Sequence, residues 1–538
     1  MQDTVTGTYT FGYDNINRLT SATVDYSFDS AGALTVQYGY DKASNRTSMT
    51  DPQTAPTTYG YDTLNRLHTL TYNNQTPNFV FGYDALSRRN SLTRPNSVDT
   101  TYGYDPVSRL MSVLHKLGTT TLDGAVYTYD GAGNRLTRAD KRTNVTLTYG
   151  YDNIYQLKTA KQGTTTKESY TYDLVGNRLS SLGVNPYNYN SSNELTSIPS
   201  GSYGYDNNGN RTSDPAGAQY SWDYENRLTQ VILPGTGGTV NFKYDPFGRR
   251  VQKAFTQNGT TTTTDYLYDG ANILETLNQS GSVLARYTDS TSIDEPLSEL
   301  VSGTTSYYEQ DGLGSVSSLS NSAGALANTY TYDSYGKLTA STGTIANPFQ
   351  YTGREFDPET GAYYYRNRYY DRNVGRFFGE DPVGFRGGIN FYAYVANSPT
   401  GRLDPYGLAP VNPADMASLS NLFPGSRNLG DDGLVVPMPC DQVKKTLEQS
   451  GYYTRSNWSS WNPFLFWDPI AHSGGWEYRK PDGMHFRMVY PKKPCDQTCT
   501  LDEAHNDNYN PMYDPSGHFW HELVPYVFTI FPPPPHGR

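Results

Sequence analysis

The sequence predicts a mostly β protein, in which an antiparallel sheet of repeated hairpins is followed by a small α+β C-terminal domain. The first observation is a tyrosine-aspartate pair that recurs about every 21 residues through much of the chain. The second is composition, because 50 glycines with many threonines, serines and asparagines favour strands and tight turns. The third is that 49 of the 538 residues are tyrosine, whereas hydrophobic residues total only 36%. Tyrosine therefore supplies much of the buried surface, and its hydroxyl needs a partner.

The repeat has a regular first part and a more divergent second part. The regular pairs are Tyr13-Asp14, Tyr40-Asp41, Tyr61-Asp62, Tyr83-Asp84, Tyr104-Asp105, Tyr129-Asp130, Tyr151-Asp152, Tyr172-Asp173 and Tyr205-Asp206. The divergent pairs are Trp222-Asp223, Tyr244-Asp245, Tyr268-Asp269 and Tyr332-Asp333. So many copies of one pair indicate a structural role rather than a catalytic one.

Each unit predicts a strand, a turn and a return strand. Tyr127 and Tyr129 share one face of a strand, because side chains alternate with period two. Residues 130–135, Asp-Gly-Ala-Gly-Asn-Arg, then reverse the chain, since Asp accepts backbone N–H groups and Gly or Asn adopts positive φ. One hairpin per unit gives a long antiparallel sheet, and such repeats bury their faces by stacking on their neighbours.

Charge and cysteine usage argue against some classes of protein, although the charge does not exclude a nuclease in the C-terminal part. The net charge of −11 is spread along the chain, so no part has the basic surplus of a general nucleic-acid binder. The three cysteines all follow position 439, so no disulfide framework supports the repeats. No run of about 18 apolar residues occurs, and the sequence therefore predicts no membrane-spanning segment.

The repeats end in the stretch Tyr363 to Leu408, which contains Asp-Pro-x-Gly twice, at residues 381–384 and 404–407. Asp, Pro and Gly at these positions predict type I turns. After this stretch the composition changes, because five of the six tryptophans and six of the eight histidines follow it. The change predicts a domain boundary.

This stretch resembles a known family. Its elements are Arg-x-Arg-Tyr-Tyr-Asp (366–371), Gly-Arg-Phe (375–377), the two Asp-Pro-x-Gly motifs, Gly-Gly-x-Asn-x-Tyr-x-Tyr (387–394) and Asn-x-Pro (397–399). Together they are similar to the RHS-associated core domain, and the tyrosine-aspartate units resemble the YD-repeat (RHS-repeat) family. The resemblance implies a spiralling β-sheet shell over residues 1–350, a core domain over 351–408 and a variable C-terminal toxin domain over 409–538.

The resemblance also implies an aspartyl autoprotease. Its catalytic pair would be Asp381 and Asp404, with Arg368 in support, and the bond cut would be Leu408–Ala409. Two carboxylates brought within about 3 Å cannot both ionise, so one stays protonated while the other activates water. Such a site needs no cofactor. Because Asp404 lies four residues before the bond, the reaction would be intramolecular and favoured by proximity.

Residues 409–538 predict a compact domain that contains a short helix over 441–450, a hairpin over 475–490 and a loop followed by a strand or helical turn over 504–524. The resemblance implies a toxin here, often a nuclease, with an immunity protein and a secretion or delivery apparatus as partners. Such a protein would leave a bacterium and act in the cytoplasm of a target cell. Neither the toxin's cofactor nor its target follows from the residues.

The residues leave several chemistries open for this domain. Histidines near an arginine suit metal-independent RNA cleavage, with one His as base, one as acid and Arg on the phosphate; the candidates are His472, His485, Arg487, His505, His518, His521 and Glu522. The same histidines could simply fill an aromatic core. Zinc is the competing idea, with the loosely spaced ligands Cys495, Cys499, His518 and His521. Cys495 and Cys499 could also form a disulfide, and a deaminase motif is not met because no His-x-Glu precedes them. The redox state of Cys440 is open as well.

A different class of function also fits the repeat. Aromatic faces could bind glycans in a structural or adhesive cell-surface protein, whose terminal domain would then be harmless.

Overall fold

The computed structural model describes residues 1–411 and, beyond them, six short strands. The chain divides into two compact units, residues 1–417 and 418–538. The described part of the first unit contains β-strands and three short 3-10 helices. A mostly β fold is therefore confirmed.

The first sheet has 17 strands, and each strand pairs antiparallel with the next along the chain. Its strands are β1 (Gln2–Asp3), β2 (Gly7–Tyr13), β3 (Leu19–Tyr26), β4 (Leu34–Tyr40), β5 (Arg46–Thr50), β6 (Pro56–Tyr61), β7 (Leu67–Tyr72), β8 (Phe79–Tyr83), β9 (Arg89–Thr93), β10 (Val98–Tyr104), β11 (Leu110–Leu117), β12 (Thr120–Tyr129), β13 (Arg135–Asp140), β14 (Thr146–Tyr151), β15 (Leu157–Gln162), β16 (Thr165–Tyr172) and β17 (Arg178–Ser181).

A small three-stranded sheet follows, and then a second long sheet of 14 strands. The small sheet contains β18 (Asn188–Tyr189), β19 (Leu195–Ile198) and β20 (Gly201–Ser202). The long sheet contains β21 (Gly204–Tyr205), β22 (Arg211–Ser213), β23 (Gln219–Trp222), β24 (Leu228–Ile232), β25 (Thr239–Tyr244), β26 (Arg250–Gln257), β27 (Thr260–Asp269), β28 (Asn272–Leu277), β29 (Val283–Asp289), β30 (Pro296–Val301), β31 (Thr304–Gln310), β32 (Val316–Ser320), β33 (Leu326–Tyr332) and β34 (Leu338–Thr342).

The repeat pair builds the turn of each hairpin. The register shifts at Tyr129, so this tyrosine forms a β-bulge, and its hydroxyl donates to the carbonyl of Leu110 at 2.8 Å. The carboxylate of Asp130 then accepts the N–H groups of Ala132 and Asn134 at 2.9 and 2.8 Å. The same bulge and hydroxyl contact recur in other units, including those of Tyr40, Tyr61 and Tyr83. The structural interpretation of the Tyr-Asp pairs is confirmed.

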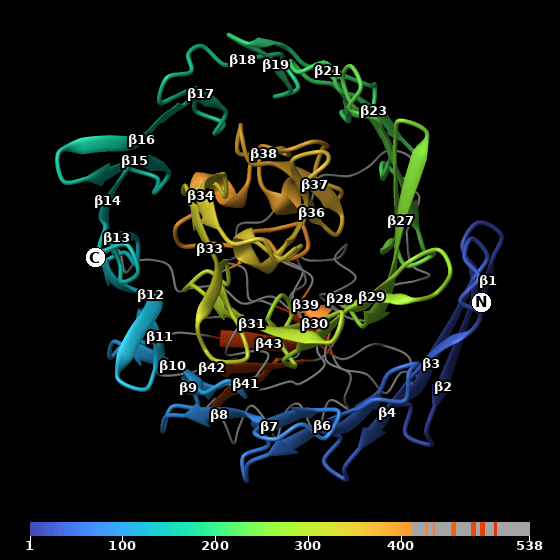
Figure 1. Ribbon diagram of the computed structural model, residues 1–538. Coiled ribbons are helices and arrows are strands. Elements are labelled where there is room, and N and C mark those ends of the chain that lie inside the picture. The colour runs from blue at the N-terminus through green and yellow to red at the C-terminus, as the bar shows by residue number, and fades with distance from the viewer. Residues whose placement is uncertain are drawn as a thin grey trace. The chain divides into compact units, whose positions relative to one another are not determined.

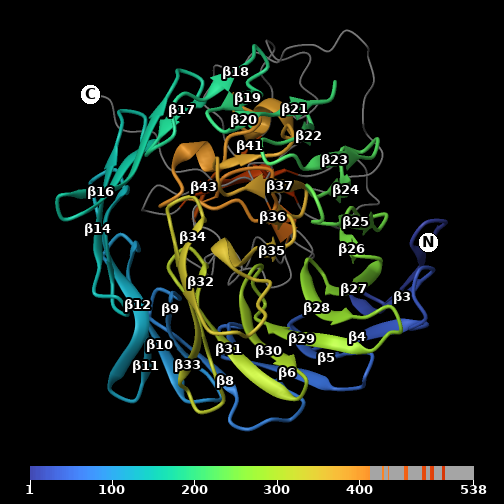
Figure 2. The same ribbon diagram turned by 45° about the horizontal axis from the view of Figure 1, so that its top comes forward.

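Contacts between distant strands show that the successive sheets wind into a spiral. The hydroxyl of Tyr26 donates to the carbonyl of Tyr266, 240 residues later. Arg142 donates to the carbonyl of Tyr330 across 188 residues, and Arg250 binds Asp357 across 107. Over these three contacts the sequence separation falls from 240 to 107 residues. In Figures 1 and 2 the strands from β1 to β27 run around the outside, and β31 to β34 lie within that turn.

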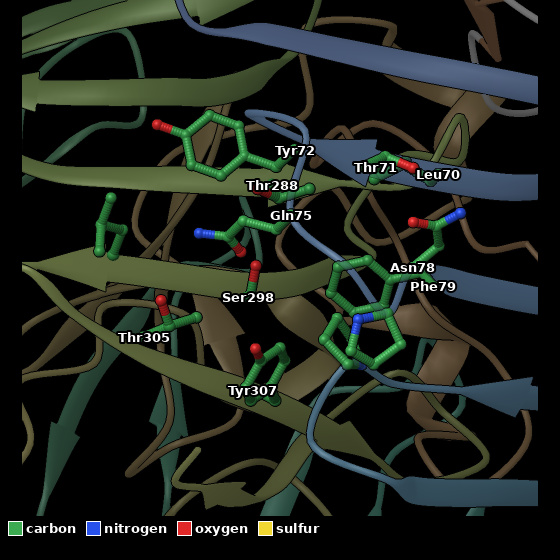
Figure 3. A pocket seen from close by; sticks show the side chains of 13 residues that line it. Leu70, Thr71, Tyr72, Gln75, Asn78, Phe79, Thr288, Ser298, Thr305 and Tyr307 are labelled. Carbon is green, nitrogen blue, oxygen red and sulfur yellow. The ribbon is translucent and has the colours of Figure 1, made fainter.

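Polar contacts join successive turns of the spiral. Arg94 donates to the carbonyl of Tyr308, Asn96 to the hydroxyl of Ser320 at 2.8 Å, and Ser318 to the carboxylate of Asp123 at 2.7 Å. A pocket lies on the same seam, between the β7–β8 region and strands β29 to β31 (Figure 3). Its lining is mainly polar and aromatic and includes Tyr72, Gln75, Asn78, Thr288, Ser298, Thr305 and Tyr307. Adjacent turns are therefore fixed by hydrogen bonds as well as by apolar contacts.

A four-stranded sheet lies at the inner end of the spiral. It contains β35 (Glu355–Asp357), β36 (Ala362–Tyr365), β37 (Arg368–Asp371) and β38 (Arg376–Phe377). The 3-10 helices η1 (Tyr351–Gly353), η2 (Gly384–Gly387) and η3 (Val395–Asn397) flank it. The aromatic side chains of β36, β37 and β38 are buried, and the rings of Tyr370 and Tyr394 lie 4.5 Å apart between centroids. This small sheet carries the candidate site.

The second unit is described only as strands, namely β39 (Arg427–Asn428), β40 (Leu434–Val435), β41 (Tyr453–Trp458), β42 (Gly475–Arg479), β43 (His485–Val489) and β44 (Thr500–Asp502). Strands β42 and β43 pair antiparallel, with Arg479 opposite His485. This pairing confirms the predicted hairpin. The predicted helix over 441–450 and the segment 504–524 lie outside the described residues. Within the described part of the chain, no helix has both the length and the apolar character needed to cross a membrane.

Candidate active site

Both Asp-Pro-x-Gly motifs form turns, as predicted. The N–H of Gly384 donates to the carbonyl of Asp381 at 3.0 Å, and that of Gly407 to the carbonyl of Asp404 at 3.3 Å. Both glycines have positive φ, +62° and +68°, which non-glycine residues adopt at a cost. The turns leave both aspartates in the interior, where Asp381 is 8% exposed and Asp404 is 2% exposed.

Arg368, at the start of β37, bridges the two carboxylates. Its Nη2 atom lies 2.8 Å from Oδ2 of Asp381 and 3.5 Å from Oδ2 of Asp404. The guanidinium stacks on the ring of Phe377 at 3.6 Å and donates to the carbonyls of Gly407 and Phe391. Because its position is fixed on several sides, Arg368 sets where the two carboxylates lie.

The Leu408–Ala409 peptide bond lies against Asp404. The N–H groups of Leu408 and Ala409 donate to Oδ1 of Asp404 at 2.9 and 3.2 Å. Two backbone hydrogen bonds between Leu403 and Val411, 2.9 and 2.7 Å long, close the chain into a loop around this bond. The loop therefore presents the nitrogen of Ala409 to a buried carboxylate.

Asp381 lies on the carbonyl side of the same bond. A Cβ atom placed on Gly387 would lie 2.3 Å from Oδ2 of Asp381 and 2.7 Å from the carbonyl oxygen of Leu408. These two oxygens therefore lie within about 5 Å of one another. The two aspartates flank the peptide group, one near its nitrogen and the other near its oxygen.

Burial tunes the acidity of the pair. It raises the pKa of Asp381 to about 6, although Arg368 opposes the rise. Burial raises the pKa of Asp404 to about 6 as well, against Arg368 and the N–H groups of Leu408 and Ala409. Because both pKa values lie near 6, each carboxyl group is partly protonated around that pH. A pair with one acid and one base is what general acid–base chemistry on a peptide requires.

The structure brings together the residues that the sequence indicated for self-cleavage, namely Arg368, Asp381, Asp404, Leu408 and Ala409. It adds Phe377 as the support of Arg368, and Gly387 as the residue that separates Asp381 from Leu408. In the sequence, Gly387 stands out only as the first glycine of the Gly-Gly pair at 387–388. The sequence alone does not show why glycine is needed there. Within the described residues, no cluster of three or more His, Cys, Asp or Glu side chains is placed to bind a metal ion.

The side chains of the candidate residues in the C-terminal domain lie outside what the structure describes. His485 and Arg487 belong to β43, and only the backbone of that strand is described. The remaining candidates lie outside the described residues; they are His472, His505, His518, His521, Glu522, Cys440, Cys495 and Cys499.

Comparison with known proteins supports the spiral architecture. The family model for the Teneurin YD-shell matches residues 140–398. The crystal structure of TcdB2-TccC3-Cdc42 superposes on 78% of this chain and 24% of that chain, with a TM-score of 0.66 and 21% identity. The chain is similar to YD-repeat shell proteins over residues 140–398. At 21% identity the superposition shows the shared shell fold alone.

Two curated relatives align with 53% of this chain. One is a tRNA3(Ser)-specific nuclease WapA from Bacillus spizizenii, 34% identical over 299 residues. The other is a double-stranded DNA deaminase toxin A from Burkholderia cenocepacia, 27% identical over 317 residues. The aligned part spans only 11% and 22% of these two relatives.

Proposed function

We propose that this protein is a self-processing toxin carrier, which cuts its own Leu408–Ala409 bond to release residues 409–538. The proposal rests on the position of that bond, whose nitrogen donates to Asp404 and whose carbonyl oxygen lies near Asp381. A buried acidic pair whose pKa values are raised to about 6, placed on both sides of one peptide group, suits hydrolysis of that bond.

The chemistry follows from the two positions. Asp381 in its charged form takes a proton from a water molecule as the water oxygen bonds to the carbonyl carbon of Leu408. Asp404 in its protonated form gives its proton to the nitrogen of Ala409, and the C–N bond then breaks. The products are a carboxylate at Leu408 and an amine at Ala409. Arg368 orients both carboxylates and limits how far each pKa rises. One turnover per chain is enough.

Cleavage should be fastest near pH 6 and slower on both sides. Above about pH 7 both aspartates are charged and no acid remains, whereas below about pH 5 both are protonated and no base remains. The measurement is the conversion of newly made full-length chain into pieces of 408 and 130 residues at several pH values, with sequencing of the new N-terminus. A new N-terminus other than Ala409, or a chain that stays whole after folding, would contradict the proposal.

The released domain is proposed to be a toxic nuclease that acts on RNA in the cytoplasm of a target cell. Support comes from the curated relative described as a tRNA nuclease. The histidine and arginine residues identified in the sequence suit base, acid and phosphate-binding roles. The spiral shell would enclose the domain until delivery, an export apparatus would carry it out of a bacterium, and an immunity protein would protect the producer.

Inducible cytoplasmic expression of residues 409–538 should stop growth and degrade RNA. Alanine at His485, His505, His518 or His521 should restore growth at any position that carries the chemistry. RNA integrity, DNA sequence and translation are followed over the first minutes after induction. Damage to DNA with intact RNA would refute the RNase assignment and leave the carrier proposal standing. Harmless expression at high level would favour the adhesive alternative.

A further inference from the structure

We propose that Gly387 is a positioning residue for self-cleavage, because its lack of a side chain lets Asp381 approach the carbonyl of Leu408. This inference rests on the proposed function. A Cβ atom at Gly387 would lie 2.3 Å from Oδ2 of Asp381, 2.8 Å from its Cγ and 2.7 Å from the carbonyl oxygen of Leu408. Contacts this short cannot be kept, so one of the two groups must move.

The backbone of Gly387 does not itself require glycine. Its φ lies outside the left-handed region, unlike that of Gly384 or Gly388. The backbone conformation therefore allows alanine at position 387. The steric conflict of an added methyl group is with the carboxylate of Asp381 and the carbonyl oxygen of Leu408. A methyl group there acts on the distance between reacting groups and leaves the turn intact.

The first atom that a methyl group would displace is Oδ2 of Asp381, which is also the atom that Arg368 contacts at 2.8 Å. A shift of that oxygen weakens the ion pair with Arg368. Since Arg368 opposes the rise in the pKa of Asp381, loss of the contact raises that pKa further. The displaced carboxyl group is then a poorer base at a given pH, as well as being misplaced.

The test substitutes Gly387→Ala in the full chain and follows cleavage after cell-free synthesis. A displacement of about 1 Å in a reacting group costs about 100-fold in rate, and we expect a loss of that size. The acid limb of the pH–rate profile should move to higher pH. A purely structural effect of the substitution would not move that limb.

Gly401→Ala is the matched control, because Gly401 has ordinary φ and no atom within 4 Å of the added methyl group. We expect it to cleave like the wild type. Folding is checked by comparing the thermal midpoint of the chain that carries both Gly387→Ala and Asp404→Asn with that of the Asp404→Asn chain, since neither is cut, and the two should agree. Wild-type cleavage by Gly387→Ala, or slow cleavage with an unmoved acid limb, would overturn the inference. If the wild type itself stays uncut, the proposed function fails instead.

Discussion

Asp404→Asn and Asp381→Asn should each leave a single chain of 60.0 kDa under conditions in which the wild type is cut. Asparagine keeps the size of the side chain, and its amide oxygen can still accept the N–H groups of Leu408 and Ala409 at position 404 and that of Val383 at position 381. It cannot carry the proton that the reaction needs. Removal of a positioned acid or base typically costs about 10²- to 10⁴-fold, so cleavage should slow by that factor.

The repeat offers a matched control for these two variants. Asp105 also precedes a proline in a turn, and its carboxylate accepts the N–H groups of Val107 and Arg109 at 3.0 and 2.8 Å. Asp105→Asn removes the same charge from the same kind of turn, far in sequence from the Leu408–Ala409 bond. It should therefore be cut at the wild-type rate. Equal cleavage of all three variants and the wild type would show that Asp381 and Asp404 are turn residues only.

The hairpin repeat could be predicted from local residues, because each signal acts within a few positions. The carboxylate of Asp130 binds N–H groups two and four residues later, and Gly133 supplies the positive φ of the turn. The bulge at Tyr129 was not predicted, although it explains why tyrosine is needed there. Its hydroxyl reaches the carbonyl of Leu110 in the preceding unit, a contact set by sheet geometry.

The sequence does not predict which residues come into contact between successive turns of the spiral. These contacts depend on how twist and curvature add over many strands, so small differences per hairpin change which residues meet a full turn later. That is why Arg142 meets Tyr330 after 188 residues, whereas Arg250 meets Asp357 after 107. The candidate site could be predicted in part. Its acidic pair followed from a linked motif, but the contact of Asp404 with the nitrogen of Ala409 needed the fold.

Arg250→Met should destabilise the first unit by about 3–5 kcal/mol, because it leaves buried carboxylates without their main counter-charge. Arg250 is 1% exposed and lies 2.8 Å from Glu355, with Asp357 as its second partner. Burial raises the pKa of Asp357, but Arg250 and Lys253 outweigh it and lower that pKa below its ordinary value. Without Arg250 the charged carboxylate of Asp357 keeps only Lys253 as a cationic partner. The measurement is the free energy of unfolding in denaturant, on chains that also carry Asp404→Asn so that none is cut.

Arg88→Met is the control. The side chains of Arg88 and Asp84 are 22% and 24% exposed and pair within one turn, so this ion pair should contribute no more than about 1 kcal/mol. The two variants also separate shell stability from catalysis. Glu355 and Asp357 lie on β35, which pairs with β36 and through it with β37, the strand that begins at Arg368. In chains that retain Asp404, Arg250→Met should therefore delay cleavage while Arg88→Met should not. Similar losses for both variants would mean that the inner sheet does not depend on this contact with the spiral.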